Sequence, residues 1–142
     1  MSVIKSKRSE SEMQFIMTAR ELQKYTIQKC VGFPKRYTFY VSQPIAACAT
    51  RIHEDVKMAN SIFPTNEHEF QMRRDYFLRA NAELNSLVSQ IELANELFGL
   101  EANVMKHWME LVETEIRLVK AVMKKEKEKF KKSMEAKNQA DA

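Results

Sequence analysis

The sequence predicts an all-α protein, an up-down-up-down antiparallel four-helix bundle with disordered termini. Only two glycines and three prolines occur in 142 residues, fewer than a turn-rich β-protein needs. Apolar residues recur at helical spacing in four blocks. Short corners with turn-forming residues separate the blocks, so successive helices should run antiparallel. The expected helices lie near residues 14–31, 37–63, 67–98 and 101–131.

The first helix has an apolar stripe at steps of three and four residues: Phe15, Ala19, Leu22, Thr26 and Cys30. Gly32 is expected to adopt the left-handed conformation that ends this helix, and Pro34 prevents its resumption. The corner GFPKRYTFY (32–40) carries four aromatic rings, so it is first a helix stop with aromatic packing. Its two cations, Lys35 and Arg36, can also meet a phosphate backbone.

The second helix shows the same alternation through Val41, Ile45, Cys48, Ile52, Val56, Ala59 and Phe63. Pro44 interrupts it, because proline removes a backbone hydrogen bond and kinks a continuous helix. Two interpretations stay open at this stage. Either the helix is continuous and kinked at Pro44, or residues 37–43 form a separate first turn and the regular helix begins at Pro44.

The last two helices are bounded by clearer signals. Asn66 followed by Glu69 predicts a capping box, and Gly99 predicts the stop between the third and fourth helices. The third stripe contains Phe70, Phe77, Leu84, Leu87 or Val88, Ile91, Ala94 and Phe98, and the fourth contains Met105, Trp108 or Met109, Val112, Ile116, Val119 and Met123. Most methionines are therefore expected in the core.

The chain has a length suited to one domain. We expect a flexible N-terminal segment at 1–12, the bundle at 13–132 and a flexible tail at 133–142. The sequence has no apolar run long enough to span a membrane, and its N-terminus has no apolar signal-peptide region. Its two cysteines stand on apolar stretches, which suits reduced thiols in the cytoplasm.

No constellation of catalytic residues is evident. The three histidines lie on different expected helices, without a Glu-x-x-His motif or a Cys-x-x-Cys motif nearby. Neither a glycine-rich phosphate loop nor a nucleophile elbow occurs. The sequence therefore predicts a non-enzymatic protein without a cofactor or metal.

The formal net charge is +4, and residues 124–142 alone contribute +3 (seven lysines against four acidic residues). Cations gather at the first corner and on the third and fourth helices, where residues 117, 120 and 124 share one face. A positive stripe suffices for salt-sensitive phosphate contact, but an ordinary charged exterior explains it equally well. Small residues beside the apolar stripes of the second and third helices are also compatible with oligomerisation.

Three segments carry a resemblance to a known family: KYTI (24–27), FPKRYTF (33–39) and DYFLRANAELNSLVSQIELANELFGL (75–100). They resemble a superfamily of small bacterial four-helix bundles. Its members include proteins encoded in ribosomal-RNA intervening sequences and the accessory variability determinant (Avd) of diversity-generating retroelements. The likeness covers residues 15–123. The A-E-G-Y-G-R stretch of the intervening-sequence proteins is replaced here by residues 58–64, which favours the retroelement branch.

The resemblance implies a homopentameric barrel that binds RNA or cDNA through basic surface residues. It also implies association with a reverse transcriptase, whose mutagenic cDNA synthesis the protein would assist without catalysing it. The candidate contacts to nucleic acid or polymerase are Lys35, Arg36, Arg73, Arg74, Arg79, Arg117, Lys120, Lys124 and Lys125. Of these, only the pair at 35 and 36 lies in a matching motif. The alternative is a structural homo-oligomeric bundle that mediates protein interaction without binding nucleic acid.

Overall fold

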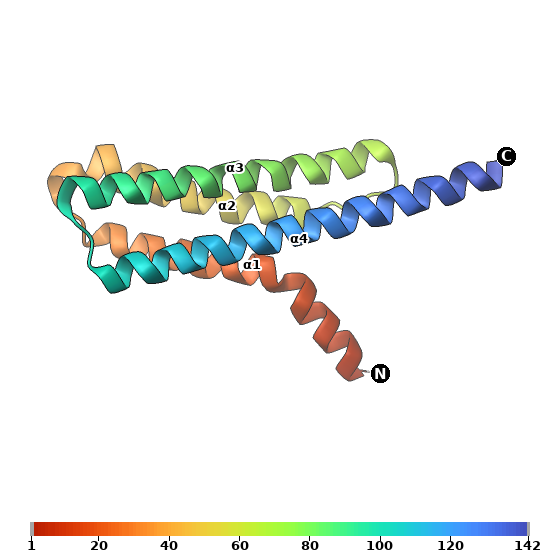
Figure 1. The fold of residues 1–142 in the computed structure, drawn as a ribbon, viewed down its shortest axis with the longest axis horizontal. Helices are drawn as coiled ribbons and strands as arrows, with labels where there is room; N and C mark the ends of the chain where they lie inside the picture. Colours follow the sequence, from red (N-terminus) through yellow and green to blue (C-terminus); the bar gives the residue numbers. More distant parts are fainter. Residues whose placement is uncertain (1, 142) are drawn as a thin grey trace.

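The computed structural model describes the backbone of residues 2–141 and the side chains of residues 13–140. Its four helices are α1 (Ser2–Val31), α2 (Gln43–Ser61), α3 (Glu67–Phe98) and α4 (Ala102–Asp141). Two short turns, η1 (Lys35–Tyr37) and η2 (Thr38–Ser42), connect α1 to α2. The helices run antiparallel to their neighbours around one core, as Figure 1 shows. The predicted all-α four-helix bundle is confirmed.

The four apolar stripes meet in that core. Trp108 is fully buried, and its indole N–H donates a hydrogen bond of 2.9 Å to the hydroxyl of Thr26 on α1. The ring of Tyr25 meets it edge-on, with centroids 6.0 Å apart. Aromatic side chains dominate the burial energy of such cores, and a buried indole N–H needs a partner. This contact fixes the register between α1 and α4.

Two core predictions are wrong. Phe63 is 80% exposed, because α2 ends at Ser61 and the chain then turns away from the bundle. Most methionines are not buried either. Among the described side chains Met123 is buried, Met105 and Met109 pack partly buried against the core, and the exposed ones are Met13, Met17, Met58 and Met72. These four lie beside the stripes rather than on them.

The first corner forms by a different mechanism from the one predicted. Among the described residues only Gly99 has a positive φ, so Gly32 does not adopt the left-handed conformation. Instead α1 closes with two tightened turns, in which Gly32 N–H bonds the Lys29 carbonyl and Phe33 N–H bonds the Cys30 carbonyl, both at 3.1 Å. Such bonds satisfy helix-end carbonyls without a left-handed residue.

Pro44 lies in the first turn of α2. The preceding residues form the separate turns η1 and η2, and η2 has the wider π-helical geometry. A distinct first turn is therefore present, but η2 runs directly into α2 with helical backbone at Ser42 and Gln43, so each interpretation is right in part. Proline is tolerated in a first helical turn because the N–H it lacks has no intrahelical partner there.

The other two corners follow the sequence signals. The Asn66 side chain accepts the Glu69 backbone N–H at 2.9 Å, as expected for the cap of α3. The Glu69 carboxylate reaches one residue further back than a capping box requires, to the N–H and hydroxyl of Thr65 at 2.9 and 2.7 Å. Gly99 has a φ of 72° and ends α3. The asparagine cap at the start of α3 and the glycine stop at its end are both confirmed.

The terminal helices extend beyond the predicted bundle limits. Helix α1 begins at Ser2, and α4 continues through the segment after residue 132 to Asp141. The flexibility of residues 1–12 and 133–142 stays a prediction. Within the part of the chain that the structure describes, no helix is long and apolar enough to cross a membrane.

Candidate nucleic-acid interface

A shallow groove of about 340 Å³ runs between α3 and α4, and we call it the cationic groove. It is lined by Arg74, Asn81, Lys120, Met123, Lys124 and Lys127. The three lysines follow each other on α4 at spacings of four and three residues, so they share one helix face. Arg74 and Asn81 form the opposite wall on α3. Two antiparallel helices thus bring four cations together.

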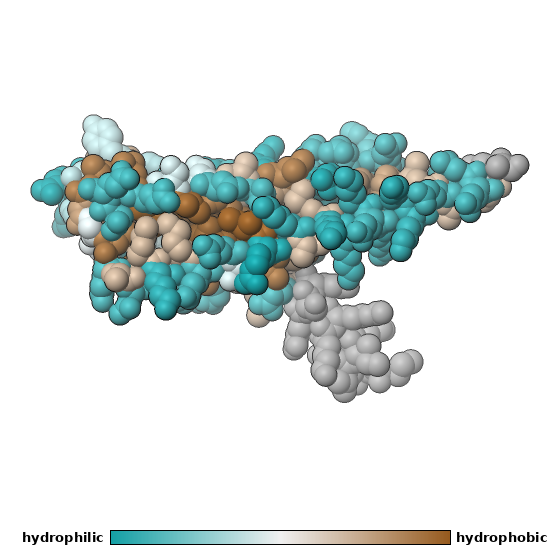
Figure 2. Space-filling model, viewed as in Figure 1, coloured by the Kyte–Doolittle hydropathy of each residue, from teal (hydrophilic) through white to brown (hydrophobic). Residues whose placement is uncertain are grey.

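The charge of the cationic groove is not compensated internally. None of its four cations forms an ion pair in the described structure, and no carboxylate lines it. Hydrophilic side chains cover the C-terminal half of α4 on this face, whereas apolar side chains gather nearer the opposite end of the bundle (Figure 2). Four positive charges without counter-charges form a local site for polyanions.

The positive stripe on α4 is longer than the groove. Arg117 and Lys131 continue the same three-and-four spacing at either end, and both are exposed. The guanidinium of Arg117 donates a hydrogen bond of 3.5 Å to the hydroxyl of Thr114. Lys125 is also exposed, but it lies about 100° around the helix from its neighbour Lys124. It therefore points away from the line of the stripe.

Arg73 is bonded to other helices of the bundle, unlike its neighbour Arg74. Its side chain is only 12% exposed and bonds one Glu126 oxygen, with Nε at 2.7 Å. Its Nη1 donates to the carbonyls of Ala59 and Ile62 at 2.8 and 2.9 Å. These carbonyls lie at the C-terminal end of α2, where the Ala59 carbonyl also accepts the Ile62 backbone N–H at 3.2 Å. Arg73 therefore ties α2 and α4 to α3 and has little capacity left for a phosphate.

Arg79 lies on the other side of α3. Its guanidinium is 3.9 Å from the carboxylate of Asp55 on α2 and 5.5 Å from the ring of Tyr76. Five residues along a helix correspond to about 140° of rotation, which turns Arg79 away from Arg74. The structure does not bring this residue into the cationic groove.

Lys35 and Arg36 lie at the opposite end of the bundle from the cationic groove. Both are exposed on η1, and the Arg36 guanidinium is 5.1 Å from the ring of Tyr37. Tyr37 in turn packs against Phe98 at the C-terminal end of α3, with ring centroids 5.2 Å apart. The nine predicted contacts therefore do not form one surface.

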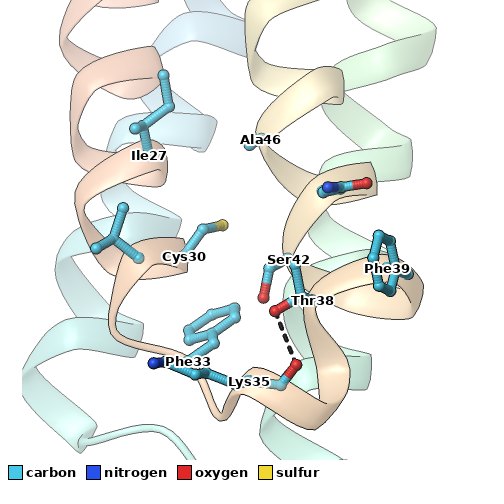
Figure 3. Close-up of a pocket in the computed structure, with 10 residues that line it drawn as sticks. Ile27, Cys30, Phe33, Lys35, Thr38, Phe39, Ser42 and Ala46 are labelled. Atoms are coloured by element: carbon cyan, nitrogen blue, oxygen red, sulfur yellow. Dashed lines mark hydrogen bonds between the residues drawn. The ribbon is translucent and has the colours of Figure 1, made fainter.

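A second groove, the corner groove, lies beside this pair and is mostly apolar (Figure 3). Its volume is about 560 Å³, and its lining includes Ile27, Cys30, Val31, Phe39 and Ala46. Ser42 also lines it, with a hydroxyl that is buried and has no hydrogen-bond partner. Large exposed apolar side chains at such a groove are typical of contact with another protein surface.

Sequence reasoning missed two residues of the cationic groove. Lys127 continues the spacing of residues 117, 120 and 124, so the periodicity itself could have included it. Asn81 could not be found in this way, because its relevance comes only from facing α4 across the groove. Its side-chain oxygen is buried and has no hydrogen-bond partner.

The two cysteine thiols are buried and unreactive. Burial raises the pKa of the Cys30 thiol to about 12, and burial is also the main cause that raises the pKa of Cys48. A thiol reacts as its thiolate, so both cysteines are protonated and unreactive at neutral pH. Within residues 13–140, no three His, Cys, Asp or Glu side chains are grouped so that they could hold a metal ion.

No protein-family model and no curated protein matches this chain. Its function is therefore inferred from its own residues and from the resemblance described above.

Proposed function

We propose that this chain is a non-enzymatic, nucleic-acid-binding accessory protein that oligomerises and assists the reverse transcriptase of a diversity-generating retroelement. The single observation that carries the nucleic-acid part is the uncompensated charge of the cationic groove. Lysine and arginine that face solvent without carboxylate partners bind phosphates by releasing counterions. The reverse-transcriptase partner and the pentameric state rest on the resemblance to Avd.

The candidate contacts on α3 and α4 separate into three groups under this proposal. Arg74, Lys120 and Lys124 act as the central phosphate contacts, joined by Lys127. Arg117 and Lys125 extend the positive surface on α4. Arg73 and Arg79 already have partners inside the bundle, so we assign them a structural role rather than a phosphate contact.

The test is binding of a structured RNA, followed by fluorescence anisotropy over a salt series. We expect affinity that falls linearly with the logarithm of the salt concentration, because each neutralised phosphate releases counterions. Absence of binding at low salt would contradict the proposal. Co-purification with a reverse transcriptase encoded beside the gene tests the partner, and light scattering tests the oligomer.

A structural homo-oligomer that mediates protein interaction is the second candidate, and the corner groove favours it. Val31 and Phe39 are 82% and 75% exposed there, which is unfavourable for a monomer in water. This candidate predicts a stable multimer that is indifferent to RNA. Val31→Glu should then dissociate the multimer, whereas Arg74→Glu with Lys120→Glu should leave it and its partners unchanged.

A further inference from the structure

We infer that the cationic groove binds the backbone of a single nucleic-acid strand and discriminates against a duplex. This inference rests on the proposed nucleic-acid binding and specifies its ligand. It is carried by the shape of the groove, the straight arrangement of its cations and the side chains that are missing from it.

The cations are arranged along a straight line. Lys120 and Lys127 are seven residues apart, which corresponds to about 10 Å along the axis of α4. With Arg117 and Lys131 included, the line extends over 14 residues, or about 21 Å. A flexible single strand can place successive phosphates along such a line. The phosphates of a duplex follow a curved path and leave the line after a short distance.

The position of the groove between two packed helices also favours a single strand. Packed helices have axes only about 8–10 Å apart, so the depression between α3 and α4 admits a single backbone but not a convex double helix. Arg74 is half-buried in the wall opposite the lysines, so its planar guanidinium is reached only by a ligand that enters the groove. Such a group can donate two parallel hydrogen bonds to one phosphate.

Asn81 supports a ligand inside the groove rather than above it. Its side-chain oxygen is buried without a partner, so the amide loses no hydrogen bond at this oxygen when it reorients. A reoriented amide can donate an N–H to a phosphate oxygen beside Arg74.

The absence of an aromatic side chain from the lining fixes the orientation of the strand. Proteins that hold single strands by their bases use aromatic stacking. The cationic groove offers Met123 as its only apolar lining residue, so the bases point outward and the phosphates point inward. Binding should therefore be independent of sequence and dominated by salt.

The experiment compares a single-stranded oligonucleotide with the duplex of the same sequence, by fluorescence anisotropy over a salt series. We expect the single strand to bind at least five-fold more tightly at low salt. The variant K120Q/K124Q/K127Q should lose at least ten-fold affinity for the single strand. Its slope of log affinity against log salt should become shallower by about 2, because three phosphate contacts are lost at about 0.7 each.

A matched variant removes the same charge elsewhere. K24Q/K57Q/K106Q changes three exposed lysines outside the groove and should lower affinity less than three-fold. All six lysines are exposed, so both variants should fold. A third arm adds a nucleoside triphosphate, which has too few phosphates to span the line and should not displace the strand at micromolar concentration.

The outcomes separate the two proposals. Binding without a preference for the single strand, or equal losses in the two triple variants, overturns the inference and leaves nucleic-acid binding intact. Displacement by micromolar triphosphate also overturns it, in favour of a small-ligand site. No binding of either oligonucleotide overturns the proposed function together with this inference.

Discussion

Two ionisable side chains in this bundle, one largely buried and one fully buried, have opposite surroundings. Arg73 on α3 makes hydrogen bonds to two carbonyls of the α2 end and an ion pair with Glu126 of α4. Glu115 on α4 is 0% exposed, and neither of its carboxyl oxygens has a hydrogen-bond partner. The first region places a charge where three helices can satisfy it. The second places an acid where nothing does.

The difference shows in the protonation of the two groups. Arginine stays charged in proteins, so its burial requires partners, and Arg73 has them. Glutamate can instead become neutral, and burial raises the pKa of Glu115 to about 9. A buried charge can thus be accommodated by bonding or by keeping a proton. These two solutions respond differently to mutation and to pH.

Arg73→Met should give the largest loss of stability. It leaves the Ile62 carbonyl and the Glu126 carboxylate without their Arg73 partner and removes one of the two donors to the Ala59 carbonyl, so we expect a cost of about 3 kcal/mol. Chemical denaturation measures this cost. The neighbouring change Arg74→Met removes a residue without an ion pair and should stay within about 0.5 kcal/mol. Equal losses in the two variants would contradict the contrast between these positions.

Glu115→Gln should stabilise the protein by a similar amount at neutral pH. The unfolded carboxyl ionises near its ordinary pKa of 4.5, whereas the folded one keeps its proton up to about pH 9. Holding that proton at pH 7 costs about 3 kcal/mol, at about 1.4 kcal/mol for each pKa unit. Glutamine has nothing to protonate and avoids this cost. A variant no more stable than the original at pH 7 would show that Glu115 has a partner.

The difference in stability between Glu115→Gln and the original protein should also depend on pH, with a definite sign. Because the folded pKa of Glu115 is raised, its contribution is fully favourable below pH 4.5 and is lost as the pH rises towards 9. The stability difference between Glu115→Gln and the original should therefore be under about 1 kcal/mol at pH 5 and grow with pH.

Comparing the stability of the variant with that of the original protein at each pH cancels the contributions of other titrating groups. Burial raises the pKa of Asp55 to about 6, which also lowers stability as the pH rises from 3.8. Burial lowers the pKa of His53, which acts in the opposite direction. Both are present in the two proteins and cancel. A difference that stays flat between pH 5 and 9 would contradict the assignment to Glu115.

The two glycines offer the smallest contrast. Gly99 has a positive φ, so Gly99→Ala should cost about 1 kcal/mol by backbone strain, although its new methyl group meets no atom within 4 Å. Gly32 has no such φ, and a methyl group there lies 3.5 Å from the Lys29 carbonyl. Gly32→Ala should therefore be neutral or raise stability by about 0.5 kcal/mol. Thermal unfolding of both variants tests this order of stability. The reverse order would contradict the mechanisms described for the ends of α1 and α3.

The sequence signals predicted the bundle well because they are local. Helical periodicity, the asparagine cap and the glycine stop each depend on residues within one or two turns, and all three are confirmed by the structure. Gly32 shows the limit of this reasoning. A glycine followed by proline suits a left-handed stop, but the carbonyls of α1 found partners in tightened turns instead.

The two buried charges were missed although the pattern contained a signal. The third stripe has a gap between Phe70 and Phe77, and Arg73 fills it. In the fourth stripe Glu115 stands between Val112 and Val119, at the spacing of a core position. A charged residue inside an apolar stripe therefore indicates a buried charge. Periodicity cannot show whether such a charged residue has a partner, because the partner comes from another helix.

The burial of Trp108 provides an internal spectroscopic reporter. The chain has a single tryptophan, so its intrinsic fluorescence comes from one indole held between α1 and α4. Its emission should shift to longer wavelength when these helices separate and water reaches the ring. Because the lining of the cationic groove contains no aromatic residue, a bound strand should leave that emission unchanged, and unfolding and binding can be followed independently in one sample.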